Sequence, residues 1–143
     1  GATINTPSML ATEDYIAALE WAKSIGGLPA MIDRANANAK VLTDWIEATP
    51  WVRNMVADPA QRTNTGVCFV FQGEWFDSLS ADDQAAVPGK IYKMLEAEGV
   101  GYDFNGYRDA PPSLRIWCGG TVESDDIARL IPWIEWAFAE LQK

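Results

Sequence analysis

A short apolar segment near the C-terminal end of the chain, residues 112–118, most constrains the fold. Prolines precede it, Gly119 and Gly120 follow it, and its apolar residues predict a short buried β-strand. Arg115 lies in the middle of this strand. Because an unpaired guanidinium is costly to bury, Arg115 must reach solvent, a nearby carboxylate or an anionic ligand.

Composition restricts the class of protein. The 143 residues are 48% hydrophobic and 22% charged, which is typical of one globular domain. The net charge of −9, with scattered basic residues, argues against a nucleic-acid partner. The chain contains no apolar run of the length that spans a membrane. We therefore expect a cytoplasmic domain without nucleic-acid or membrane partners.

Several residue types that carry chemistry in other proteins are expected to be structural here. The chain has no histidine, which removes the commonest zinc ligand and base, so we expect no metal site. Cys68 and Cys118 lie in apolar runs and are expected to be buried thiols. Arg62 and Asn64 are expected to be turn residues, and most of the seven tryptophans are expected to pack in the core.

Apolar periodicity and turn residues predict the order of the elements. We expect helices at 7–25 and 29–49, a helix at 90–98 after a break at Pro88, and a last helix following the acidic segment 121–126. Strands are expected at 51–56, 67–71, 102–105 and 112–118, and a loop at 72–79. Residues 1–143 are therefore predicted to form a single α+β domain, with a small, mainly antiparallel sheet covered by helices on one face.

The first predicted helix is apolar around most of its circumference. Only Glu13, Glu20 and Ser24 form a clear polar stripe. A helix of this kind usually lies between two layers or faces another chain. We therefore expect a neighbour for it beyond this domain.

Two places suit an anion. Asn5 and Thr6 precede the first helix, whose free backbone N–H groups favour phosphate, although Thr6 as a plain N-cap explains the same residues. Arg108 and Arg115 could clamp a dianion between them, although Arg108 could equally pair with its neighbour Asp109.

Several segments have family-specific residue types and spacings. They are 4–10 (INTPSML), 13–15 (EDY), 21–27 (WAKSIGG), 62–65 (RTNT) with 67–69 (VCF), 106–112 (GYRDAPP) and 114–119 (LRIWCG). They resemble phosphoserine aminotransferases of the alpha-proteobacterial type, over essentially the whole chain. The resemblance identifies the chain as the small C-terminal domain of such an enzyme.

The resemblance implies a homodimeric fold-type I enzyme that uses pyridoxal 5'-phosphate to exchange an amino group between phosphoserine and 2-oxoglutarate in serine biosynthesis. It implies that Asn5 and Thr6 contact the cofactor phosphate of the neighbouring subunit, within a segment 1–27 that combines this phosphate loop with an interdomain helix. Arg115 would bind the substrate α-carboxylate, and Arg108 the substrate phosphate or side-chain carboxylate. Tyr107 replaces a histidine that many members have beside Arg108.

The chain departs from the family in one important respect. In the family the Schiff-base lysine lies upstream, on the large N-terminal domain, and none of the lysines here (23, 40, 90, 93 and 143) has a cofactor context. The resemblance therefore implies a large N-terminal domain as partner and no activity of this fragment alone. The alternatives are a self-contained, non-enzymatic α+β regulatory or dimerisation module, and the small domain of another fold-type I transaminase.

Overall fold

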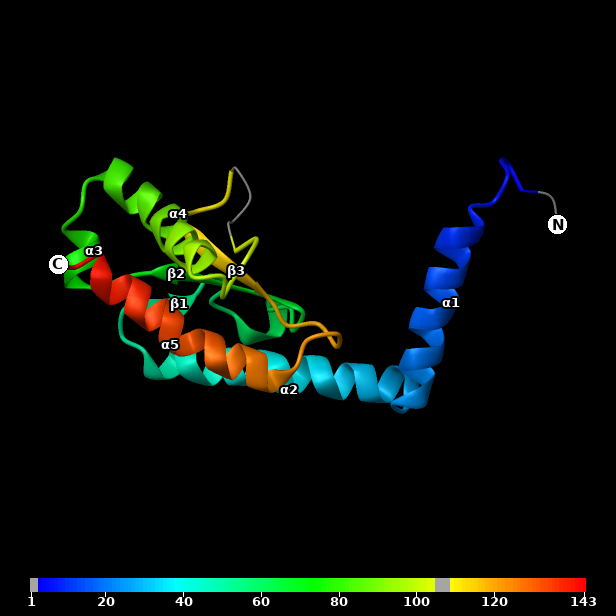
Figure 1. Ribbon diagram of the computed structural model, residues 1–143. Helices are drawn as coiled ribbons and strands as arrows, with labels where there is room; N and C mark the ends of the chain where they lie inside the picture. The colour runs from blue at the N-terminus through cyan, green and yellow to red at the C-terminus, as the bar shows by residue number, and fades with distance from the viewer. Residues whose placement is uncertain (1–2, 105–108) are drawn as a thin grey trace.

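A computed structural model describes residues 3–104 and 109–143 (Figure 1). Its elements are α1 (Met9–Ser24), α2 (Gly27–Ala48), β1 (Val52–Asn54), a 3-10 turn η1 (Pro59–Gln61), β2 (Gly66–Phe71), α3 (Glu74–Asp77), α4 (Ala81–Ala97), β3 (Ser113–Trp117) and α5 (Ser124–Glu140). The three strands form one antiparallel sheet in the order β1-β2-β3. The predicted α+β class is confirmed.

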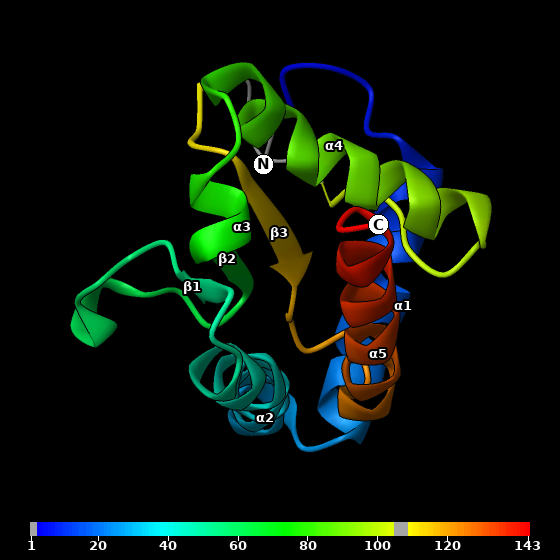
Figure 2. The same cartoon turned by 90° about the vertical axis from the view of Figure 1, so that its left-hand side faces the viewer.

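β2 is the central strand, as its aromatic and β-branched residues favour. Side chains alternate along a strand, so Val67, Phe69 and Phe71 share one face of the sheet. Phe69 pairs with Leu114 of β3, and Val67 pairs with Ile116. These five residues are buried in the core with residues of α2, α4 and α5, which cover this face (Figure 2).

α2 is tied to the connection between β3 and α5 by a buried amide. The side-chain nitrogen of Asn38 donates to the carbonyl oxygens of Cys118 (3.3 Å), Gly119 (3.1 Å) and Val122 (2.8 Å). Its side-chain oxygen accepts a hydrogen bond from the Ser124 hydroxyl at 2.7 Å. Asn38 is 1% exposed, so these bonds satisfy a polar group inside the core.

The predicted break at Pro88 is wrong, because α4 continues through it from Ala81 to Ala97. The Ser80 hydroxyl accepts from the backbone N–H of Asp83 at 3.2 Å and caps the helix. Pro88 is buried in the helix interior. Its packing offsets the backbone hydrogen bond that proline cannot donate. Residues of the expected loop 72–79 also form the short helix α3.

The predicted strand at 102–105 is wrong for residues 102–104, and Asn105 lies outside the described residues. Asp103 has a φ of 57°, which is incompatible with an extended strand. One backbone hydrogen bond does join this segment to the sheet, from the N–H of Arg115 to the carbonyl of Phe104 at 3.0 Å.

α1 projects away from the packed body of the molecule (Figure 1). None of its 16 residues, all of which are described, is buried. Ser8, not Thr6, is the N-cap residue. Gly26 (φ 117°) and Gly27 (φ 70°) adopt left-handed conformations that suit glycine, and they turn the chain sharply into α2. The exposure of α1 agrees with the expectation of a neighbour outside this domain.

Candidate functional site

The sheet face opposite the core carries the candidate site. We call this the open sheet face; by alternation it consists of Arg53, Gly66, Cys68, Val70, Ser113, Arg115 and Trp117. Val70 and Ser113 are buried, whereas Arg53 and Trp117 are exposed and Cys68 and Arg115 are half-buried. The face therefore presents charged and aromatic groups to solvent, in contrast to the apolar face beneath α2, α4 and α5.

Arg115 lies in the middle of β3, directly opposite Cys68 of β2. Its side chain is 31% exposed, and its Nη2 atom lies 3.5 Å from Oδ2 of Asp103. The guanidinium thus reaches both solvent and a local carboxylate, as the chemistry of a strand arginine requires.

The positive charge of Arg115 acts on the neighbouring thiol. Burial raises the pKa of Cys68, and the nearby Arg115 charge acts in the opposite direction. Cys118 is 0% exposed, and burial raises its pKa to about 11. Both cysteines are free, so the prediction of two thiols is confirmed, although only Cys118 is fully buried.

Asn5 and Thr6 lie in an exposed segment before α1. α1 carries them away from the sheet, so this chain does not bring them to Arg115 (Figure 1). Amide and hydroxyl groups of this kind can donate to a phosphate, but α1 begins at Met9 after the N-cap Ser8, so Asn5 and Thr6 precede the helix N-terminus and do not form it. Arg108 and Tyr107 lie outside the described residues.

The polar loop before β2 has a structural explanation. Arg62 donates from Nε to the carbonyl of Val56 at 2.8 Å and from Nη2 to the carbonyl of Ala57 at 3.0 Å. Asn64 donates to the side-chain oxygen of Asn36 at 2.7 Å. These contacts are those of turn residues, as the sequence predicted.

The prediction that most tryptophans pack in the core is wrong. Three belong to the core or pack against it, namely Trp45, Trp51 and Trp75. The others expose between 36% and 57% of their surface; they are Trp21, Trp117, Trp133 and Trp136. Their apolar neighbours in the sequence suggested burial, but these residues lie on outward-facing positions of helices or on the open sheet face.

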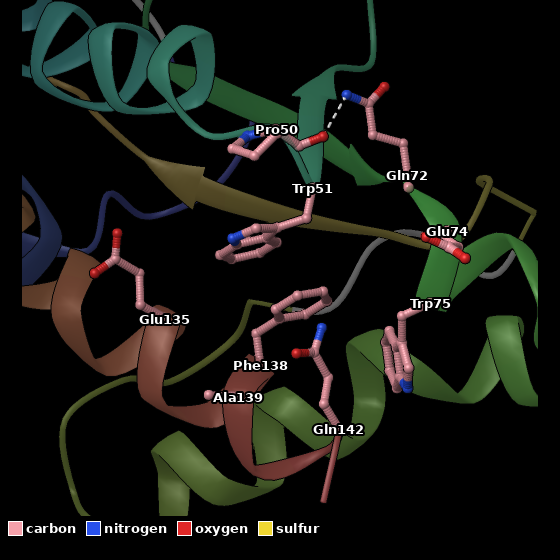
Figure 3. Close-up of a pocket in the computed structure, with 10 residues that line it drawn as sticks. Pro50, Trp51, Gln72, Glu74, Trp75, Glu135, Phe138, Ala139 and Gln142 are labelled. Carbon is pink, nitrogen blue, oxygen red and sulfur yellow. Dashed lines mark hydrogen bonds between the residues drawn. The ribbon is translucent and has the colours of Figure 1, made fainter.

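Sequence reasoning missed a pocket at the end of the sheet (Figure 3). Its floor is aromatic, because the rings of Trp51 and Phe138 stack with centroids 3.8 Å apart and Trp75 meets Phe138 edge-on at 5.2 Å. Glu135, which also lines the pocket, accepts a hydrogen bond from the indole of Trp45 at 3.0 Å. The pocket joins segments far apart in the chain, so no local motif indicates it.

Two findings concern the described residues alone. They contain no group of three or more histidine, cysteine, aspartate or glutamate side chains placed to hold a metal ion. Among them, no helix combines the length and the apolar character needed to cross a bilayer.

Fold and site together define a small α+β domain with a guanidinium on its open sheet face and an uncovered helix at its start. No family model matches the chain. It is 44% identical over 96% of its length to the phosphoserine aminotransferase of Methanosarcina mazei, and equally to that of Methanosarcina barkeri. A solved phosphoserine aminotransferase from Bacillus circulans subsp. alkalophilus shares its fold, with a TM-score of 0.76 and 20% identity over 93% of this chain and 33% of the other.

The chain corresponds to the C-terminal part of phosphoserine aminotransferases. It spans 35% of the length of the two Methanosarcina relatives. The resemblance expected from the sequence motifs is therefore confirmed.

Proposed function

We propose that this chain is the C-terminal domain of a phosphoserine aminotransferase, which transfers an amino group between phosphoserine and 2-oxoglutarate in serine biosynthesis. The observation that carries the proposal is the 44% identity to enzymes of that name over 96% of the chain. The activity belongs to the whole protein, in which a large N-terminal domain is the partner of this one. We further propose a cytoplasmic homodimer.

Arg115 is proposed to bind the α-carboxylate of the amino donor and of the 2-oxo acid. A guanidinium forms two parallel hydrogen bonds with a carboxylate, which fixes the orientation of the substrate as well as its position. The partial exposure of Arg115 on the open sheet face supports this role, since a substrate can approach it from outside the domain.

Asn5 and Thr6 are proposed to hold the phosphate of pyridoxal 5'-phosphate in the neighbouring subunit. The projection of α1 away from the body supports a contact outside the same domain (Figure 1). When bound, this cofactor supplies the electron sink that amino-group transfer needs. Arg108 is proposed to bind the phosphate or side-chain carboxylate of the substrate.

The test is the kinetics of the full-length protein that contains this segment. Arg115→Ala should lower kcat/KM for both phosphoserine and 2-oxoglutarate. The expected loss of transition-state stabilisation is roughly 2–5 kcal/mol, the cost of removing one partner from a desolvated charge pair. Arg53→Ala is the matched control, because Arg53 is an exposed arginine on the same sheet face. Among the contacts of the described residues, its side chain makes one long hydrogen bond, to the carbonyl of Asn54 at 3.5 Å.

Three results would contradict parts of this proposal. Unchanged kinetics of Arg115→Ala would remove the carboxylate-binding role. A strong preference for another amino donor would place the domain in a different fold-type I transaminase. Absence of any transaminase activity in the full-length protein would favour a non-enzymatic module.

A further inference from the structure

Asp103 and Phe104, which precede β3 in the chain, contact Arg115 although they do not belong to a strand of the sheet. Asp103 Oδ2 lies 3.5 Å from Nη2 of Arg115, and the carbonyl of Phe104 accepts the backbone N–H of Arg115 at 3.0 Å. Two consecutive residues therefore engage the side chain and the backbone of the same arginine. Such a double contact fixes where the acidic side chain lies relative to the guanidinium.

The backbone of this segment has a specific shape. Asp103 is the non-glycine residue with positive φ among those described, at 57°. A Cβ atom on Gly101 would lie 2.1 Å from the ring of Phe104, so the segment folds tightly back on itself. Unfavourable backbone conformations of this kind persist where the surrounding structure holds them, and they cluster at functional sites.

Tyr92 of α4 lies near the segment. Its hydroxyl donates to Oε1 of Glu96 at 2.9 Å. This hydrogen bond is the main cause of the raised pKa of Tyr92, and the backbone N–H of Asp103 acts on that pKa in the opposite direction.

We infer that Asp103 is a positioning residue for Arg115: placed beside β3 by the backbone hydrogen bond of its neighbour Phe104, it directs the guanidinium with its carboxylate so that Arg115 can receive the carboxylate of an amino-acid or 2-oxo-acid substrate. This inference rests on the proposed role of Arg115. The 3.5 Å separation is longer than a direct charge-assisted hydrogen bond, so a substrate carboxylate can pair more closely with Arg115 while Asp103 stays in place.

The experiment uses the full-length holoenzyme with Asp103→Asn, which removes the charge but keeps a side chain that tolerates a positive φ. The dissociation constant of 2-oxoglutarate, measured by calorimetry, should rise about two- to fivefold, the range of an exposed ion pair, with kcat changed less than the KM values of both substrates. Asp103→Gly should act in the same direction, because it removes the carboxylate and glycine tolerates the positive φ at this position. The control is Asp44→Asn, since Asp44 is an exposed aspartate paired with Lys40 on α2.

A lower dissociation constant in Asp103→Asn would show that Asp103 competes with the substrate, and an unchanged constant would show that it has no role; both results overturn the inference. If Asp103→Asn fails to fold, the same two results are read from Asp103→Gly. Arg115→Lys, measured in parallel, separates this inference from the proposed function. If neither Asp103→Asn nor Arg115→Lys changes the binding of 2-oxoglutarate, the proposed role of Arg115 is wrong. If Arg115→Lys weakens binding and Asp103→Asn does not, only the role of Asp103 is rejected.

Discussion

α1 and α5 are apolar helices of nearly the same length, but they differ in how much of their surface is buried. α1 has 16 residues, and 74% of Leu10 and 51% of Leu19 are exposed. α5 has 17 residues and buries five of them, which are Ile127, Leu130, Ile134, Ala137 and Phe138. Apolar content therefore does not decide burial. The five buried residues of α5 lie on a face that meets α2 and α4, although Trp133 and Trp136 of the same helix are exposed. The apolar residues of α1 surround the helix, and none of them is buried.

The difference indicates what is missing around α1. Large exposed apolar surfaces in proteins usually mark a contact with another domain, chain or membrane. This chain spans 35% of the length of its Methanosarcina relatives, so a neighbouring domain is the covering element that we propose. Packing of α5 is completed within this chain, and packing of α1 is not.

Equal truncations of two leucines test this comparison most directly in the 143-residue chain. Leu42→Ala, at a position of α2 that is 0% exposed, should lower the free energy of unfolding by about 2–5 kcal/mol, because it leaves a cavity in the core. Leu10→Ala on α1 should change it by less than about 0.5 kcal/mol, since exposed positions make few contacts. Urea denaturation followed by tryptophan fluorescence measures both. A comparable loss in Leu10→Ala would show that α1 packs against the body of the isolated domain in solution.

The packed body could be predicted in good part from the sequence. The apolar runs around Phe69 and Leu114 indicated β2 and β3, and the three- and four-residue spacing of apolar residues indicated α2 and α5. The failures occurred where tertiary contacts decide the local structure. Pro88 is buried inside α4, and Asp103 leaves the extended region in a segment that contacts Arg115 of β3.

At the candidate site, the strand chemistry indicated Arg115 but not the residue that contacts it. Arg115 was found because an arginine within a buried strand needs a partner. Asp103 was missed, since its contact depends on a backbone turn that no local motif indicated. The binding roles of Arg115, Asn5, Thr6 and Arg108 came from the family resemblance, and they stay predictions.

The second test concerns the buried hydrogen bonds of Asn38, which join α2 to the connection between β3 and α5. Asn38→Leu would leave the carbonyls of Cys118, Gly119 and Val122 without their donor, and it should lower the free energy of unfolding by about 1–3 kcal/mol. Ser24→Ala on α1 is the comparison, because the Ser24 hydroxyl makes a local hydrogen bond, to the carbonyl of Trp21 at 2.7 Å. Its removal should cost less than about 0.5 kcal/mol. Thermal unfolding of both variants measures the difference, and equal losses would refute the idea that long-range polar bonds distinguish the body from α1.

The last test asks whether the contrast between α1 and α5 disappears in the complete protein. If a neighbouring domain covers α1, its backbone amides should exchange hydrogen far more slowly in the full-length protein than in this chain. Leu10→Ala should then reduce that protection by about 1–2 kcal/mol in the full-length protein, since it removes apolar area that has become buried. Glu20→Gln, on the polar stripe of the same helix, should leave the protection almost unchanged. Rapid exchange of α1 in the full-length protein would contradict the proposal that a neighbouring domain covers this helix.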